Sequence, residues 1–343
     1  MELTHPVPAD KWNLWNRVVL AVVFVWLIIT VATNAIVDPY YVFRLVPLGK
    51  GYTPNERNAK LEYLLAHPRS HDAFLIGSSR MGVYNPAQAS ALRPGRHYYN
   101  LSVFGGDAVD SLVMLKTLKA QGVTIREVVM GVDPGTFLHP RSAADPSYRH
   151  HPVVTGEPRW RFLVDHLLVS SFYHSISKLE HFALETTSTP VLNFDFTTGQ
   201  WQLVGRERRI RADPAGYRHE VFGSRPIPQA HPVRWLEPRF EEFRALVSWL
   251  HANHVEVYFF LHPLNWRERK ALEPSALDEF VRRIEGIAGP VKNYLGKPEW
   301  RDDKHFYDPK HYRPYVAEAL LRQLWLDPST RPVQATTRRK TIG

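Results

Sequence analysis

Two short segments, far apart in the chain, contain the residue types that serine-ester chemistry needs. The first is Gly77-Ser78-Ser79-Arg80, which follows an apolar run, and the second is Asp308-Pro309-Lys310-His311 near the C-terminus. A serine hydroxyl becomes a nucleophile when a histidine takes its proton and a carboxylate orients that histidine. Together the two segments predict an acyl-ester site, with a serine of the first segment as nucleophile and His311 and Asp308 behind it.

Each segment has a simpler explanation when it is considered alone. Serine is a common N-cap residue, so Ser78 or Ser79 would then only cap a helix. An aspartate and a histidine three residues apart are unremarkable in a chain with 17 histidines. The catalytic interpretation therefore depends on whether the fold brings the two segments to one site.

Apolar runs of strand length alternate with helical segments along most of the chain. Strands are expected at residues 72–77, 97–103, 127–133, 255–262 and 291–295. Helices are expected at residues 105–122, 235–253, 267–287 and 314–326. This alternation is typical of an α/β fold with a parallel sheet covered on both faces, whose functional residues follow the carboxyl ends of the strands. The rule places them just after Gly77, Val103, Asp133 and Phe260.

Residues 138–234 interrupt this alternation. The segment is rich in proline, histidine, arginine and aromatic residues, and it holds a helix candidate at 160–184 and a polar, β-like part at 193–210. It falls between the third strand and the next helix. We therefore interpret it as an insertion or cap over the site, within a core domain that spans residues 71–326.

Residues 18–37 form an apolar run without charge, about as long as the hydrocarbon core of a bilayer. Aromatic residues, which favour the headgroup level, flank the run at Trp12, Trp15, Tyr40 and Tyr41. A cleaved signal peptide would have a shorter apolar region and a small-residue cleavage site, and a buried core helix is the other alternative. We expect an uncleaved single-pass membrane anchor.

The charges around this run predict its orientation. Lys11 and Arg17 precede it and Asp38 follows it, although Arg44 and Lys50 act in the other direction. The positive-inside rule then places residues 1–17 in the cytoplasm and the core domain outside the inner membrane, in the periplasm. A connector with a short helix at 55–67 occupies residues 38–70, and residues 327–343 are expected to form a flexible basic tail.

The composition excludes several classes of function. The chain has no cysteine, so it forms no disulfide and uses no thiol catalysis or cysteine-bound metal. Its formal net charge is +9, but it shows no zinc-finger spacing and no basic heptad helix, and we expect no nucleic-acid partner. Asp302, Asp303 and His305 lie close to the second motif, yet zincin-type spacing is absent, so no metal or other cofactor is expected.

The two motifs, in this order, resemble those of the SGNH/GDSL hydrolase superfamily. There the nucleophilic serine is the third residue of a GDS-type turn after the first strand, which corresponds to Ser79 rather than Ser78. The base and its partner form a DxxH motif before the last helix, which corresponds to His311 and Asp308. The resemblance covers about residues 72–133 and 255–326. It implies a three-layer sandwich with a flavodoxin-like central sheet.

Two further blocks of that superfamily concern the oxyanion hole. Residues 100–105 (NLSVFG) resemble the second block, so the backbone N–H groups of Ser79 and Gly105 are the implied donors. The third block ends in an asparagine donor, where this chain has Asp133, and an ionised aspartate cannot donate. Asp133 is then a supporting or capping residue, or the hole is built differently, or hydrolase activity is low. Other residues expected to support the site or line its pocket are Ser78, Arg80, Asn100 and His262, the last with a buried position at its strand end as the alternative.

The C-terminal run 308–321 resembles that of membrane-attached members, which also use GSS in place of GDS. With a single anchor, this implies an enzyme that transfers O-acyl groups to, or removes them from, a cell-surface or exported polysaccharide through an acyl-Ser79 intermediate. It also implies a polytopic membrane-bound O-acyltransferase as a partner that delivers the acyl group. The alternative is a catalytically weak glycan-binding or scaffold protein of a polysaccharide assembly complex, and Asp133 is its best support.

Overall fold

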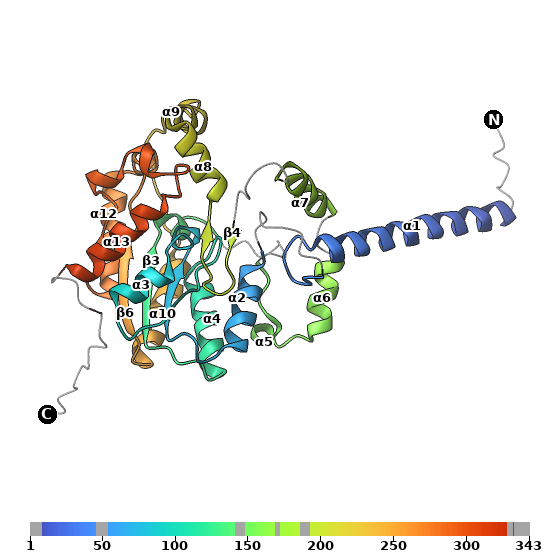
Figure 1. The fold of residues 1–343 in the computed structure, drawn as a ribbon, viewed down its shortest axis with the longest axis horizontal. Coiled ribbons are helices and arrows are strands. Elements are labelled where there is room, and N and C mark those ends of the chain that lie inside the picture. The colour runs from blue at the N-terminus through green and yellow to red at the C-terminus, as the bar shows by residue number, and fades with distance from the viewer. Residues whose placement is uncertain are drawn as a thin grey trace.

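The computed structural model describes residues 9–45, 54–140, 148–168, 172–185, 193–327 and 332 of the 343-residue chain. A long helix, α1 (Ala9–Val37), extends away from an α/β body (Figure 1). Apart from residues 327 and 332, the expected basic tail lies outside the described residues, as does the N-terminal part of the expected cytoplasmic segment.

Five parallel strands form the central sheet in the order β2-β1-β3-β6-β7. They are β1 (Ala73–Gly77), β2 (Tyr98–Asn100), β3 (Glu127–Val132), β6 (Glu256–Leu261) and β7 (Lys292–Asn293). In the register, Leu75 pairs with Asn100 on one side and with Val129 on the other. Each expected strand is present within its expected range, which confirms the α/β fold with a parallel sheet.

Alternate side chains of β1, β2, β3 and β6 enter two separate buried clusters, because successive side chains of a strand point to opposite faces. Along β1, Phe74 and Ile76 belong to one cluster and Ala73 and Leu75 to the other. The first cluster includes α4 (Ala108–Ala120), α10 (Glu237–Ala252) and α12 (Pro274–Ala288). The second includes α3 (Pro86–Leu92) and α13 (Pro314–Leu326). Both faces of the sheet are therefore covered by helices.

Three expected elements differ from those observed. Residues 267–287, expected as one helix, divide into α11 (Trp266–Ala271) and α12, because Pro274 lacks an N–H and begins a helix rather than continuing one. In residues 193–210, only β4 (Asn193–Phe194) and β5 (Trp201–Gln202) are strands. The remainder enters α8 (Val204–Ala212), whose arginines and glutamate are good helix formers.

The segment expected to be an insertion contains further short elements. The helix expected at 160–184 corresponds to α6 (Arg159–Leu168) and α7 (Phe172–Glu185), which lie at different sides of the end of α1 (Figure 1). Further elements of the body and the segment are α5 (Pro152–Thr155), α9 (Pro214–Arg218), η4 (His219–Gly223), η5 (Pro298–Trp300) and η6 (Asp303–His305).

The helix expected in the connector, α2 (Glu56–Ala66), is part of the body. Leu61 and Leu64 join the same apolar cluster as α4. Its first two turns are polar and yet buried, with Glu56, Arg57 and Lys60 all at most 3% exposed. Charged residues are rarely buried unless they are paired, so this helix must have polar partners inside the body.

Among the described residues, one helix is long and apolar enough to cross a membrane, namely Trp12–Val37 within α1, which contains an 18-residue stretch with a mean hydropathy of 2.5. Its side chains are exposed along most of its length, whereas the last turns are partly buried against α6 and α7. This agrees with a single N-terminal anchor.

Candidate active site

The chain after β1 gives the two adjacent serines different tasks. Ser78 is the N-cap of η1 (Ser79–Met81), and its side chain accepts from the N–H of Arg80. Gly77 has φ +134°, and a Cβ there would lie 2.7 Å from the carbonyl oxygen of Gly131, so the turn requires glycine. Because Ser78 caps the turn, the hydroxyl of Ser79 is left for another partner.

That partner is His311, from the turn before α13. The Oγ of Ser79 lies 2.9 Å from Nε2 of His311, although the two residues are 232 positions apart. The other ring nitrogen, Nδ1, lies 2.9 and 3.0 Å from the two carboxylate oxygens of Asp308. The fold thus brings the two predicted motifs together as a serine, a base and an acid in hydrogen-bond contact.

Asp308 is held in place by two backbone N–H groups of its own turn and by an arginine from a distant segment. Its Oδ1 accepts the backbone N–H groups of Lys310 and His311, at 2.9 and 3.0 Å. Its Oδ2 accepts from Nη1 of Arg206 at 2.8 Å. Burial would raise the pKa of Asp308, but the hydrogen bonds from His311, Lys310 and Arg206 outweigh it and hold that pKa well below its ordinary value. The carboxylate therefore stays ionised and can orient the imidazole.

Two residues of the 138–234 segment brace this pair, and no motif pointed to them. Arg206, from α8, binds Asp308 as described. The indole of Trp201 packs edge-on to His311, with ring centroids 6.3 Å apart, and stacks on Phe104. A Cβ on Gly82 would lie 1.4 Å from the indole nitrogen, so glycine is required there. Part of the segment is therefore a wall of the site rather than only a cover.

Both residues expected to supply oxyanion donors line one cavity. Gly105 has φ +59°, and a Cβ there would lie 2.7 Å from the hydroxyl of Tyr148. Within the part of the chain that the structure describes, the backbone N–H groups of Ser79 and Gly105 donate to no other group. Both are thus available to a ligand at the nucleophile.

The polar turns of α2 hold the loop that leads to Gly105. The carboxylate of Glu56 accepts the N–H of Phe104 at 2.6 Å, and the ammonium of Lys60 donates to the carbonyl of Ser102. Arg57 approaches the carbonyl of Phe104 and forms a buried ion pair with Asp110 at 2.7 Å. Burial lowers the pKa of Lys60, while Glu56 acts in the opposite direction. This support was missed because α2 was assigned to the connector.

Asn100 joins the two loops of the site without lining the cavity. Its side-chain amide is fully buried and donates to the carbonyls of Met81 and Tyr84, at 2.7 and 3.0 Å. Its Oδ1 accepts from the hydroxyl of Ser102 at 2.6 Å. Asn100 therefore ties the turn after Ser79 to the loop before Gly105.

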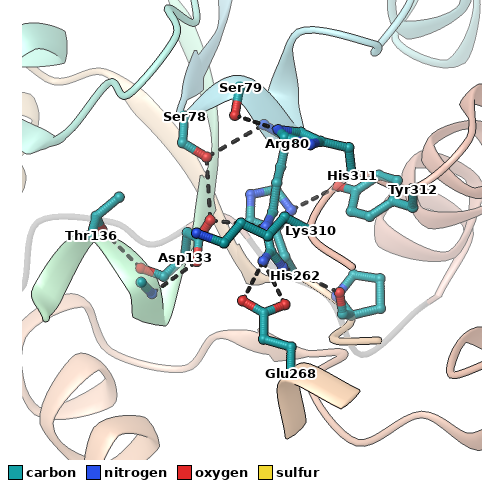
Figure 2. A network of polar contacts seen from close by, with 12 residues as sticks. Ser78, Ser79, Arg80, Asp133, Thr136, His262, Glu268, Lys310, His311 and Tyr312 are labelled. Carbon is teal, nitrogen blue, oxygen red and sulfur yellow. Dashed lines mark hydrogen bonds and ion pairs between the residues drawn. The ribbon is translucent and has the colours of Figure 1, made fainter. Parts of the chain in front are cut away.

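Asp133 is a capping and ion-paired residue, which is the first of the three interpretations left open by the sequence. Its Oδ1 accepts the N–H of Gly135 and caps η2 (Pro134–Phe137), while its Oδ2 lies 2.9 Å from Nε of Arg80 (Figure 2). Burial opposes ionisation, but Arg80 lowers the pKa of Asp133 below its ordinary value. Arg80 also contacts both carboxylate oxygens of Glu268 at 2.6 Å. Glu268, from α11, carried no sequence signal.

His262 is buried beneath the site and does not line the cavity, in keeping with the alternative given for it. Its Nδ1 lies 2.7 Å from the hydroxyl of Tyr312, the neighbour of His311 (Figure 2). The ring occupies space left by Gly131, where a Cβ would lie 2.3 Å from it. Burial, and then the nearby Arg80, lower the pKa of His262 to about 3, so the ring is neutral at ordinary pH.

A cavity of about 520 Å³ opens beside Ser79, within the range of small-ligand sites. Its walls carry arginines paired with carboxylates: Arg57 with Asp110, Arg239 with Asp107, and Arg80 with Asp133. Lys310 adds an exposed cation from the second motif. Such walls offer many hydrogen-bond donors and acceptors with little net charge.

This arrangement joins a serine hydroxyl to a histidine whose carboxylate partner is ionised, beside two backbone N–H groups that have no other acceptor among the described residues and beside a polar cavity. These are the parts that acyl transfer through a serine requires. No model of a known protein family matches the sequence, and no curated protein is found to be similar to it.

Proposed function

We propose that the chain is a serine acyl-ester enzyme in which Ser79 is the nucleophile, His311 the base and Asp308 the residue that orients the base. The observation that carries the proposal is the pair of contacts Ser79–His311 and His311–Asp308, each at 2.9 Å. Two segments 232 positions apart meet with the atoms in the order that the chemistry needs.

In the first half-reaction, the Oγ of Ser79 bonds to the carbonyl carbon of an acyl ester while its proton moves to Nε2 of His311. The negative charge that develops on the carbonyl oxygen accepts hydrogen bonds from the N–H groups of Ser79 and Gly105. One such donor typically lowers the activation barrier by about 3–4 kcal/mol. The carbon–oxygen bond of the leaving alcohol then breaks, and this alcohol takes the proton from His311.

In the second half-reaction, a hydroxyl group attacks the acyl-Ser79 ester and gives its proton to His311, and Ser79 leaves with that proton. Water as the attacking group makes the enzyme an esterase, and a sugar hydroxyl makes it an O-acyltransferase. The paired charges in the cavity favour a hydroxyl-rich acceptor, because they bind hydroxyl groups without requiring a charge on the ligand.

The identity of the acceptor rests on resemblance and on α1. A three-layer domain of the SGNH type, anchored by one helix and exported to the periplasmic side of the inner membrane, suits acyl transfer to, or removal from, a cell-surface or exported polysaccharide. We propose such a glycan as acceptor, with a polytopic membrane-bound O-acyltransferase as the supplier of the acyl group. The alternative of a catalytically weak or inactive scaffold still rests on Asp133, because an ionised aspartate cannot donate to an oxyanion even though Arg80 shares its charge.

Turnover of p-nitrophenyl acetate by the purified full-length chain, with and without an oligosaccharide acceptor, tests the proposal. We expect Ser79→Ala to abolish turnover and Ser78→Ala, the matched control at the capping serine, to retain most of it. Acceptor-dependent release of p-nitrophenol would identify a transferase. Equal turnover by wild type and Ser79→Ala under both conditions would refute the proposal and favour a scaffold.

A further inference from the structure

The exposed side of α6 carries large apolar side chains, whereas the exposed side of a helix in a soluble protein is usually polar. Trp160, Val164 and Leu168 recur at four-residue spacing and are 66%, 38% and 49% exposed. Phe162 and His166, on the opposite side, are buried. In water the exposed side of a surface helix is normally charged or polar, so this stripe indicates an apolar neighbour.

The start of α7 lies beside the apolar run of α1. The ring of Phe172 is 5.3 Å from that of Trp26, centroid to centroid. Trp26 precedes the end of α1 at Val37 by a helix length of about 16 Å. Tyr173 and Ile176 of α7 are also exposed. The surface of α7 thus continues that of α1 at a level well inside the apolar run.

Polar groups between these helices are turned inward. The buried amide of Asn34 accepts from the hydroxyl of Ser175 at 2.6 Å and donates to the carbonyl of Leu167 at 2.7 Å. The ammonium of Lys178 donates to the carbonyl of Asp38 at 2.6 Å. Helices that lie in hydrocarbon need their polar groups paired inside the cluster and their apolar side chains on the outside.

We propose that α6, α7 and the last turns of α1 form a collar that is embedded in the membrane that α1 crosses, with the apolar stripe of α6 and the start of α7 in lipid. Lipid is the occupant because α6 and α7 pack against the end of the helix that crosses the membrane (Figure 1). Arg159 and Arg161 flank Trp160 and are exposed, as basic and aromatic residues are at the headgroup level. The proposal rests on anchoring by α1 but not on the acyl chemistry.

The collar is joined to the helix that supports the oxyanion loop. The N–H of Asn55, the N-cap of α2, donates to the carbonyl of Tyr40 just after α1, at 2.6 Å, and Arg159 of α6 binds Glu62 of α2 at 2.9 Å. The side-chain amide of Asn55 also contacts His166. Docking of the collar therefore fixes the height of the cavity above the bilayer.

Because the chain has no cysteine, a single introduced cysteine can be labelled specifically. Single cysteines at Val164 or Ile176 of the full chain are labelled with a fluorophore, and the protein is reconstituted in phosphatidylcholine–phosphatidylglycerol nanodiscs with or without spin-labelled lipid. Val25→Cys in α1 is the positive control, and Ile227→Cys, exposed outside the collar, is the negative control. Leu168→Cys serves as a second stripe position, and ester turnover of each sample reports on the acyl chemistry separately.

We expect spin-labelled lipid to quench the labels at 164, 168 and 176 at least threefold more than the label at 227. Quenching at 25 together with labels at 164, 168 and 176 that behave like the label at 227 would overturn the collar while retaining the anchor. No quenching at 25 would overturn the anchor and the collar together. None of these outcomes depends on whether Ser79 is the nucleophile.

Discussion

The carboxyl edge of the sheet and the membrane-proximal collar place polar and apolar side chains in opposite ways. At the edge, apolar groups fill the interior and paired charges such as Arg80–Asp133 line a cavity open to a polar ligand. In the collar, Asn34 and Ser175 pair in the interior, whereas Trp160 and Val164 face outward. The difference teaches that burial must be judged against the solvent that each region meets, water in one and lipid in the other.

The largest expected effect is a loss of ester turnover that leaves the collar unchanged. Asp308→Asn removes the charge that orients His311, so we expect kcat for ester turnover to fall by about 10,000-fold. Lipid quenching of a label at Val164 should not change. A turnover reduced by less than tenfold would show that Asp308 has no part in the reaction.

The second effect concerns the neutral histidine below the site. Because the pKa of His262 is lowered to about 3, its neutral form stabilises the fold fully above its ordinary pKa near 6.5, and this stability is lost as the pH falls from there toward 3. At pH 5 the loss is about 2 kcal/mol relative to pH 7. We expect His262→Gln to show a correspondingly weaker acid dependence of thermal unfolding. An unchanged dependence would mean that the ring takes up a proton freely.

The third effect tests the support that α2 gives to the oxyanion loop. Glu56→Ala leaves the N–H of Phe104 without its acceptor, and we expect kcat to fall by about tenfold as Gly105 is displaced. Glu56→Gln keeps an acceptor oxygen and is the matched control, with a smaller loss. Equal kcat in both variants and the wild type would exclude α2 from positioning the donor.

The smallest expected effect lies in the collar. Asn34→Ala removes the contacts to Ser175 and Leu167, worth about 1 kcal/mol in a membrane. Amide hydrogen exchange in α7 should then be about fivefold faster. Thr30→Ala, which removes a bond within α1 itself, is the control. Faster exchange in α4 as well would show that the two regions are not separate.

The sequence predicted those parts of the molecule that depend on local pattern. The strands, the strand-end positions of Ser79 and Asp133, and the turn with Asp308 and His311 follow from apolar runs and short motifs. Arg206, Glu268 and Glu56 were missed because their roles arise from contacts between distant segments, which leave no spacing to recognise. The collar was missed for a different reason: the sequence indicates a helix at 160–184, but only the fold shows which of its side chains face outward.

The position of a covalent adduct tests the central claim most directly. The full-length protein is treated with a fluorophosphonate, digested, and mapped by mass spectrometry, with His311→Ala as the variant that lacks the base. We predict one adduct on Ser79 in the wild type and almost none in His311→Ala. An adduct on Ser78, or equal labelling of wild type and His311→Ala, would contradict the account.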